Sequence, residues 1–288
     1  MEHLLIDEQR CRQLQWSARF KIIIGIAKGV IYLHQELSPK TIHRNLNPTN
    51  IFLDNEMNPK ISGFAAARYF QDDDQSKMSV TINAGTIGYL PPEYFLEGRI
   101  SEKTDVYNFG VLVLEILSGK RNSRDTENLI GDTWKLLTGN KDVFKTVDGY
   151  LGEEFSEEEA SRCIQVGLLC TQYGPQQRPK MASALKMLLG EDVSLQEKMA
   201  QAHCPSYLDP DFADLPNFDF FNPRNCSNER QSYFHSVAPH NMEVDYATNC
   251  VQQIGQIQTP LIPPVERELI RVVSFNPFAY PYLFEYDK

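Results

Sequence analysis

One apolar run constrains the fold of this 288-residue chain more than any other feature. After a polar start, residues 105–118 are almost wholly apolar, and Gly119 follows them in the place of a helix C-cap. An α-helix that is apolar on nearly all sides has to be surrounded by other elements. The sequence therefore predicts a central buried helix with the rest of a domain packed around it.

Further helical patterns surround this run in the sequence. Residues 16–35 carry a wide apolar stripe, and Ser156 with Glu159 forms a capping-box pattern before a helix that continues to Cys170. Pro179 opens another amphipathic segment that stops at Gly190. Two short strands are expected at residues 51–53 and 60–62, on either side of a turn. We expect a mainly α fold with one or two short β hairpins.

The composition changes near residue 191. Beyond about residue 202 the chain is dense in proline, asparagine and aromatic residues, and proline removes backbone donors and ends helices. We therefore predict two parts, a helical domain at residues 1–193 and an irregular Pro/aromatic-rich tail at residues 194–288. One short helix is expected within the tail, at residues 265–273.

Charge and composition exclude several classes of protein. The net charge of −10 opposes general nucleic-acid binding, and 42% hydrophobic with 23% charged residues is ordinary globular usage. No apolar stretch reaches the ~20 residues of a transmembrane helix, and the N-terminus has no apolar core typical of a secretory signal. The six cysteines lack metal-site spacing, so we expect reduced thiols, with Cys163 and Cys170 buried, and a cytoplasmic location.

Five motifs occur in a fixed order and carry a family resemblance. They are Ile42-His-Arg-Asn-Leu-Asn-Pro-Thr-Asn50, Ile61-Ser-Gly-Phe-Ala65, Pro91-Pro-Glu93, Asp105-Val-Tyr-Asn-Phe-Gly110 and Gln177-Arg-Pro179. They resemble the catalytic loop, the D-F-G segment, the A-P-E motif, the central helix and the late arginine of protein kinases. The connecting text is similar to plant receptor-like kinases, above all to the cysteine-rich group. This implies a protein-kinase-like large, C-terminal lobe over residues 1–193.

The resemblance also shows which chemical groups are replaced. Asn45 stands where the family has the catalytic Asp, Asn47 where it often has a lysine, and Gly63 where the D-F-G Asp binds magnesium. His43 and Arg44 are retained, as is Asn50, the second metal ligand of the family. An amide has no useful basicity near neutral pH, and glycine offers no carboxylate to a metal ion. The resemblance therefore implies degenerate catalytic motifs and no metal site.

Residues that support the fold are kept. In the family, Asp105 bonds the catalytic-loop backbone, Glu93 and Arg178 form a buried ion pair, and His43 and Phe64 have packing roles. Four hydroxyls of the activation segment are candidate phosphorylation sites, those of Ser76, Ser79, Thr81 and Thr86. The alternative is that they are exposed hydroxyls without a regulatory role. Thr86 is expected to be buried.

The nucleotide-binding half of a kinase is not recognisable before His43. Neither G-x-G-x-x-G nor V-A-I-K occurs there, so we expect the small lobe to be absent. We accordingly expect no cofactor. ATP and magnesium are expected only if the family assignment holds despite a missing small lobe.

These observations predict a truncated, catalytically inactive receptor-like pseudokinase, not an enzyme, with a role in protein interaction or as a signalling scaffold. Its expected partners are other proteins, including receptor kinases, which would also account for a membrane association. One alternative is a fragment of a serine/threonine kinase that binds ATP. The other is a decaying gene copy without function.

Overall fold

The computed structural model describes residues 14–70, 78–79, 85–86, 88–122, 128–139 and 141–204. The chain divides into two units, residues 1–208 and residues 209–288. The second unit, and with it the helix expected at residues 265–273, lies outside the described residues.

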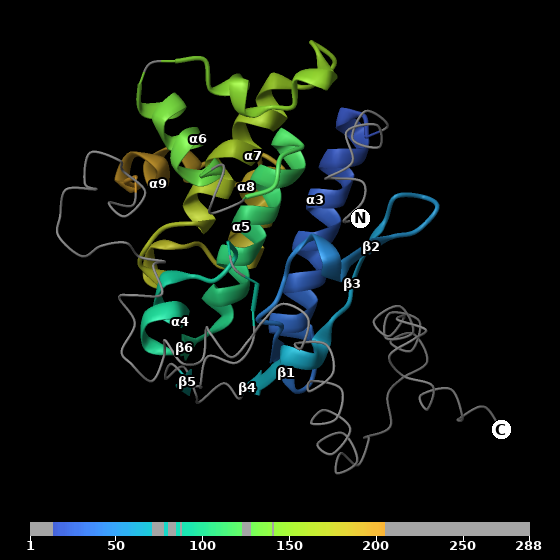
Figure 1. Cartoon of the computed structure of the whole chain (residues 1–288), viewed down its shortest axis with the longest axis vertical. Helices are drawn as coiled ribbons and strands as arrows, with labels where there is room; N and C mark the ends of the chain where they lie inside the picture. The colour runs from blue at the N-terminus through green and yellow to red at the C-terminus, as the bar shows by residue number, and fades with distance from the viewer. Residues whose placement is uncertain are drawn as a thin grey trace, which may run out of the picture. The chain divides into compact units, whose positions relative to one another are not determined.

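Seven α-helices occur in the described part of the chain (Figure 1). They are α3 (Trp16–Ile31), α4 (Pro92–Glu97), α5 (Glu102–Ser118), α6 (Leu129–Thr138), α7 (Glu157–Cys170), α8 (Met181–Leu188) and α9 (Leu195–Gln201). The strands are β1 (Lys40–Ile42), β2 (Ile51–Leu53), β3 (Pro59–Ile61), β4 (Arg68–Phe70), β5 (Met78–Ser79) and β6 (Arg99–Ile100). Short 3-10 or π turns cover Tyr32–Glu36, Pro48–Asn50, Phe64–Ala66, Val143–Thr146, Gly149–Leu151 and Pro175–Gln177.

Helix α5 is the centre of the described domain, as its apolar sequence predicts. Every residue from Thr104 to Ser118 is buried, and the helix packs against α3, α6 and α7 (Figure 1). Gly119 ends it with a φ of +64°, a conformation that glycine adopts without steric cost. Because α5 is buried on all sides, the positions of its polar side chains are fixed by their neighbours. The polar residues at its N-terminal end contact the catalytic-loop segment.

The other predicted helices form with small shifts at their ends. Helix α3 is continued by a π turn at Tyr32–Glu36, and α8 begins at Met181, two residues after Pro179. Cys163 and Cys170 are buried in α7, and burial raises the pKa of the Cys170 thiol to about 12. Both thiols are therefore protonated core side chains at neutral pH.

The described residues contain the expected short hairpin and, in addition, two sheets that are not hairpins. The described residues contain three antiparallel two-stranded sheets, β1–β4, β2–β3 and β5–β6. Only β2–β3 is the local hairpin that the sequence predicts, with Ile51 opposite Ile61. The other two sheets pair strands that are far apart in the sequence, such as Lys40 with Phe70, so no local pattern indicates them.

The predicted boundary at residue 193 is followed directly by a helix. Helix α9 packs against α7 and buries Leu195, so regular structure continues to Gln201. Among the residues that the structure describes, none of the helices combines the length and the apolar content needed to cross a bilayer.

Candidate functional site

The catalytic-loop segment that follows β1 is held by one buried carboxylate. Asp105, near the start of α5, accepts hydrogen bonds from the backbone N–H groups of His43 and Arg44, each at 2.8 Å. Its Oδ2 atom also lies 2.8 Å from Nε2 of His34. Arg44 has a φ of +70°, which is rare for a residue with a side chain. The bonds from Asp105 hold this strained backbone in place.

His43 has a packing environment. Its ring is fully buried, with Nε2 at 2.7 Å from the Ser62 carbonyl oxygen and an edge-on contact to the Phe64 ring at 4.7 Å between centroids. Burial lowers the pKa of His43, and the nearby Asp105 charge opposes this only in part. The imidazole is therefore a neutral structural group that joins the loop to the Gly63 turn.

Arg44 is also buried, and its guanidinium is directed at the activation segment. It donates to the Ala66 carbonyl at 2.9 Å and to the Tyr94 hydroxyl, and its guanidinium carbon lies 5.2 Å from the centroid of the Tyr94 ring. These contacts connect the loop with both ends of the segment between β3 and α4.

The side chains at the chemical positions of the loop bond to one another. The Asn47 amide donates to Oδ1 of Asn45 at 3.0 Å and to Oγ1 of Thr86 at 3.1 Å. The Thr86 hydroxyl in turn donates to the same Asn45 oxygen at 2.9 Å. Three neutral groups, which we call the amide triad (Asn45, Asn47 and Thr86), thus close a ring of hydrogen bonds. The Asn45 oxygen already accepts two of them.

With Asn50 in its present position, residue 63 has no room for a side chain. Its φ is +77°, and a Cβ atom built there would lie 2.2 Å from Oδ1 of Asn50. The Asn50 amide is held in this place because it donates to the Asn45 carbonyl at 2.8 Å. The volume that an aspartate at residue 63 would need is therefore filled by the Asn50 side chain.

These residues fit a magnesium site of the kinase type only in part. A hard divalent cation takes carboxylate and other oxygen ligands. Residue 63 is glycine and supplies no carboxylate, whereas Asn50 bonds through its amide nitrogen and keeps its amide oxygen. Within the described ranges, no group of three or more His, Cys, Asp or Glu side chains could hold a metal ion.

The candidate phosphorylation sites are spread over the activation segment. Ser76 and Thr81 lie outside the described residues, and Ser79 is in β5 opposite Arg99 of β6. Thr86 is half-buried rather than buried, and its hydroxyl belongs to the amide triad. Of the four hydroxyls, only that of Thr86 has a described position.

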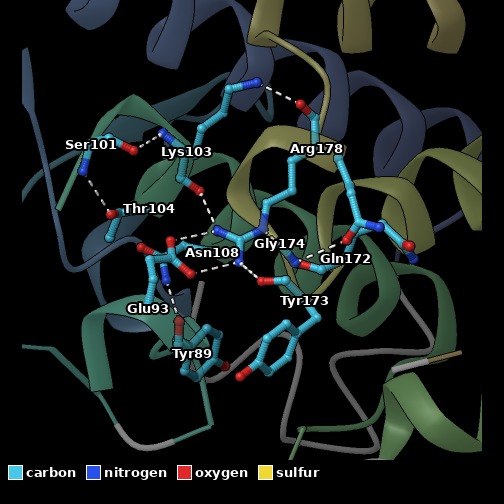
Figure 2. Close-up of polar contacts among 11 residues, drawn as sticks. Tyr89, Glu93, Ser101, Lys103, Thr104, Asn108, Gln172, Tyr173, Gly174 and Arg178 are labelled. Carbon is cyan, nitrogen blue, oxygen red and sulfur yellow. Dashed lines mark hydrogen bonds and ion pairs between the residues drawn. The ribbon is translucent and has the colours of Figure 1, made fainter. Parts of the chain in front are cut away.

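The end of the activation segment is tied down by the expected ion pair (Figure 2). Arg178 donates to both carboxylate oxygens of Glu93 at 2.7 Å, in the parallel geometry that makes such pairs strong. Its remaining donors reach three backbone carbonyls, those of Gln172, Lys103 and Tyr173, at 2.7–3.0 Å. The guanidinium thereby connects α4, α5 and the loop after α7.

The activation segment has a second anchor, which the family motifs do not indicate. Glu115, buried in the middle of α5, accepts the Tyr89 hydroxyl on both oxygens at 2.6 Å and the Asn122 N–H at 2.6 Å. Asn108 donates to the Tyr89 carbonyl, as Figure 2 shows, and the Asn122 amide donates to Gly88 at 2.8 Å. The signal for this anchor was a lone carboxylate in an apolar run. Burial raises the pKa of Glu115 to about 7.

Sequence comparison agrees with this arrangement of loop, segment and central helix. The family described as protein tyrosine and serine/threonine kinase matches residues 2–188. The chain belongs to the protein kinase family. This kinase chain is 43% identical over 201 residues to cysteine-rich receptor-like protein kinase 24 of Arabidopsis thaliana, covering 68% of the chain and 31% of that relative. It is also 43% identical over 200 residues to a G-type lectin S-receptor-like serine/threonine-protein kinase of Arabidopsis thaliana, with 68% and 24% covered.

A third relative, cysteine-rich receptor-like protein kinase 21 of Arabidopsis thaliana, is 42% identical over 201 residues, which are 68% of this kinase chain and 29% of the relative. The chain thus spans less than a third of the length of these relatives. The expectation that the chain is not an enzyme is contradicted by these comparisons, because the relatives are named as protein kinases, which are enzymes. That expectation rested on the replaced residues Asn45, Asn47 and Gly63 and on the absence of small-lobe motifs before His43.

Proposed function

We propose that this chain acts in receptor-like kinase signalling chiefly by binding other proteins, and that phosphoryl transfer by its degenerate catalytic loop is slow. The observation that carries the proposal is the contrast between anchors and chemical groups. Asp105 and Arg178 hold the loop and the end of the activation segment with charge-assisted bonds. The chemical positions of the same loop hold neutral amides that bond to one another.

The chemical part of the proposal rests on Asn45. A carboxylate at this position accepts the proton of the substrate hydroxyl in kinases. The Asn45 oxygen is an amide oxygen that already accepts bonds from Asn47 and Thr86, so it has neither the basicity nor the free lone pairs for this step. General-base assistance is worth about 10²–10⁴ in rate. Slow transfer follows from its loss.

The binding part of the proposal rests on the rigidity of the surface around α4. Glu93 is in the first turn of α4, and its bidentate bond to Arg178 fixes this helix to α5 and to the loop after α7. An ordered surface loses little conformational entropy when a partner binds. We propose receptor-like kinase domains as the partners, since the relatives are receptor-like kinases.

Isothermal titration of the purified chain with the kinase domain of a cysteine-rich receptor-like kinase tests the binding part. We expect saturable binding that the Arg178→Lys variant weakens, because lysine cannot form the planar bidentate bond. Arg162→Lys is the matched control, since Arg162 lies on α7 and pairs with the largely exposed Glu158. If the wild-type chain gives no heat of binding with a receptor-like kinase domain that is shown to be folded, the binding role is refuted.

A comparison of transfer rates tests the chemical part. The chain and the kinase domain of a 43%-identical relative are given the same ATP, magnesium and serine/threonine peptide. We expect transfer by the chain to be slower by about 10²–10⁴, because it lacks the general base. Equal rates would show that Asn45 does not limit the reaction.

Three finer expectations stay predictions. One is the absence of a small lobe, which the coding sequence upstream of Met1 would test. The others are the absence of a resident cofactor and action in the cytoplasm or at a membrane through partners. The rival reading, a fragment of a serine/threonine kinase that binds ATP, is compatible with the named relatives.

A further inference from the structure

A large open cleft lies on another part of the domain. It is bounded by the C-terminal end of α5, by α6 and by the segment from Asp142 to Glu157, and its volume is about 1170 Å³. None of the described residues that line it belongs to the catalytic loop, the amide triad or the Glu93–Arg178 pair. The proposed roles of the catalytic loop and of the surface around α4 therefore do not account for this cleft.

The cleft has an apolar floor, and one unsatisfied hydroxyl is buried in its wall. Leu136, Phe144 and Phe155 are half-buried in its walls, and Tyr150 is 50% exposed beside them. Thr146, only 6% exposed, also lines it, and its hydroxyl has no hydrogen-bond partner in the structure. A buried hydroxyl without a partner is unfavourable, and native structures usually satisfy such groups. The hydroxyl oxygen is itself buried, so it does not contribute to the choice of ligand.

The charged residues that line the cleft favour a positively charged ligand. Five carboxylates line it, those of Asp132, Asp142, Asp148, Glu153 and Glu157, against the two ammonium groups of Lys120 and Lys145. Asp132 and Asp148 are neutralised by Lys135 and Arg19. The other three carboxylates form no ion pair with another described residue. The whole chain carries a net charge of −10, which adds to the attraction of a basic partner.

We propose that this cleft binds a basic, amphipathic segment of a partner protein. The apolar side chains of the segment would pack on Phe144 and Phe155, and its lysines or arginines would pair with Asp142, Glu153 and Glu157. The volume exceeds the ~300–1,000 Å³ of ordinary small-molecule pockets, and a helix laid in a groove uses such a surface. The inference rests on the proposed protein-binding role and adds a second binding surface, apart from the one around α4.

The probe is a synthetic helical peptide of about 18 residues, or five turns, with leucine at positions i, i+3, i+4 and i+7 and lysine elsewhere. Its counterpart has glutamate in place of lysine. Titration calorimetry with the full chain should show binding of the lysine peptide alone. The affinity should fall as salt is added, because exposed charges are screened.

Two variants assign the binding to the cleft. The triple variant Asp142→Asn, Glu153→Gln, Glu157→Gln should bind the lysine peptide about tenfold more weakly. The triple variant Glu36→Gln, Glu191→Gln, Glu197→Gln removes the same charge from exposed positions outside the cleft and should bind like the wild type. Thr146→Val should raise Tm and leave the affinity for the peptide unchanged, because it removes only a buried, unsatisfied hydroxyl.

Three results would overturn the proposal: no binding of the lysine peptide, equal losses in both triple variants, or equal binding of the glutamate peptide. A receptor-like kinase domain measured in the same way separates this inference from the proposed function. If that domain binds the wild type and the cleft variant equally well, the protein-binding role stands and the cleft is the wrong surface.

Discussion

At the scale of single residues, Gly63 and Asn50 show how the loss of one side chain changes its neighbours. Gly63 has a left-handed backbone, and the space beside it is filled by the Asn50 side chain, which donates to the Asn45 carbonyl. A side chain at residue 63 and the present position of Asn50 exclude each other. The loop therefore differs from a kinase loop by more than the missing carboxylate, because the Asn50 side chain occupies the space beside Gly63.

Gly63→Ala should lower the free energy of unfolding by about 1–3 kcal/mol, because the new Cβ adopts a strained φ and displaces Asn50. Urea unfolding at neutral pH measures this. Gly149→Ala is the matched control, since no atom lies within 4 Å of the added Cβ. It should change stability by no more than about 0.5 kcal/mol. Equal effects of the two substitutions would mean that the Asn50 contact carries no energy.

Glu115 gives a second prediction at this scale, for pH dependence. Burial raises its pKa from 4.5 to about 7, so the unfolded chain ionises first and this carboxyl lowers stability as the pH rises between those values. Glu115→Gln removes the effect. Relative to the wild type, the variant should gain about 3 kcal/mol between pH 4 and pH 8. Urea unfolding across this range measures it, with the exposed Glu36→Gln as control. A difference that is flat with pH would contradict the buried, neutral state of Glu115.

At the scale of elements, the helix ends differ from the pattern that the sequence contains. Ser156 caps α7 by accepting the Glu159 N–H at 3.3 Å, but the Glu159 side chain accepts a bond from Trp16 at 2.5 Å instead of returning to the cap. A reciprocal capping box forms at the start of α5, between Ser101 and Thr104, where no S-x-x-E pattern indicates it. At α7, the Glu159 side chain therefore bonds a residue that is distant in the sequence, Trp16, instead of the neighbouring backbone.

Ser156→Ala should cost about 1 kcal/mol of stability, the usual effect of removing a helix N-cap. Thermal or urea unfolding measures it. Ser183→Ala, in the first turn of α8 but not at its N-cap, is the control and should be neutral or slightly stabilising, because alanine is the better helix former. A loss at residue 183 as large as that at residue 156 would argue against a capping role.

At the scale of the whole described domain, Arg178 connects segments that are distant in the sequence. Its guanidinium bonds Glu93 of α4, the carbonyl of Lys103 in α5, and two carbonyls after α7 (Figure 2). It also lies 4.9 Å from the centroid of the Tyr107 ring. Arg178 itself is only 1% exposed. The activation segment and the central helix thus depend on one cation.

Glu93→Gln should lower the free energy of unfolding by about 3–5 kcal/mol, because it leaves the Arg178 charge buried without its counter-ion. Glu158→Gln is the matched control: it breaks the i,i+4 pair with Arg162 at a carboxylate that is 85% exposed, and should cost no more than about 0.5 kcal/mol. Urea unfolding of both variants compares them. A small effect at Glu93 would show that other bonds to Arg178 hold the segment.

The sequence by itself determined the helices around an apolar central run, the β2–β3 hairpin, the kinase family, and the amide and glycine at residues 45 and 63. These depend on local periodicity, on turns and on the identity of side chains. Only the tertiary structure decided the β1–β4 and β5–β6 pairings, the bond from Thr86 to Asn45 and the raised pKa of Glu115. Such features join residues far apart in the chain. The energy of a buried polar group depends on which neighbours replace its water, and the fold alone brings those neighbours together.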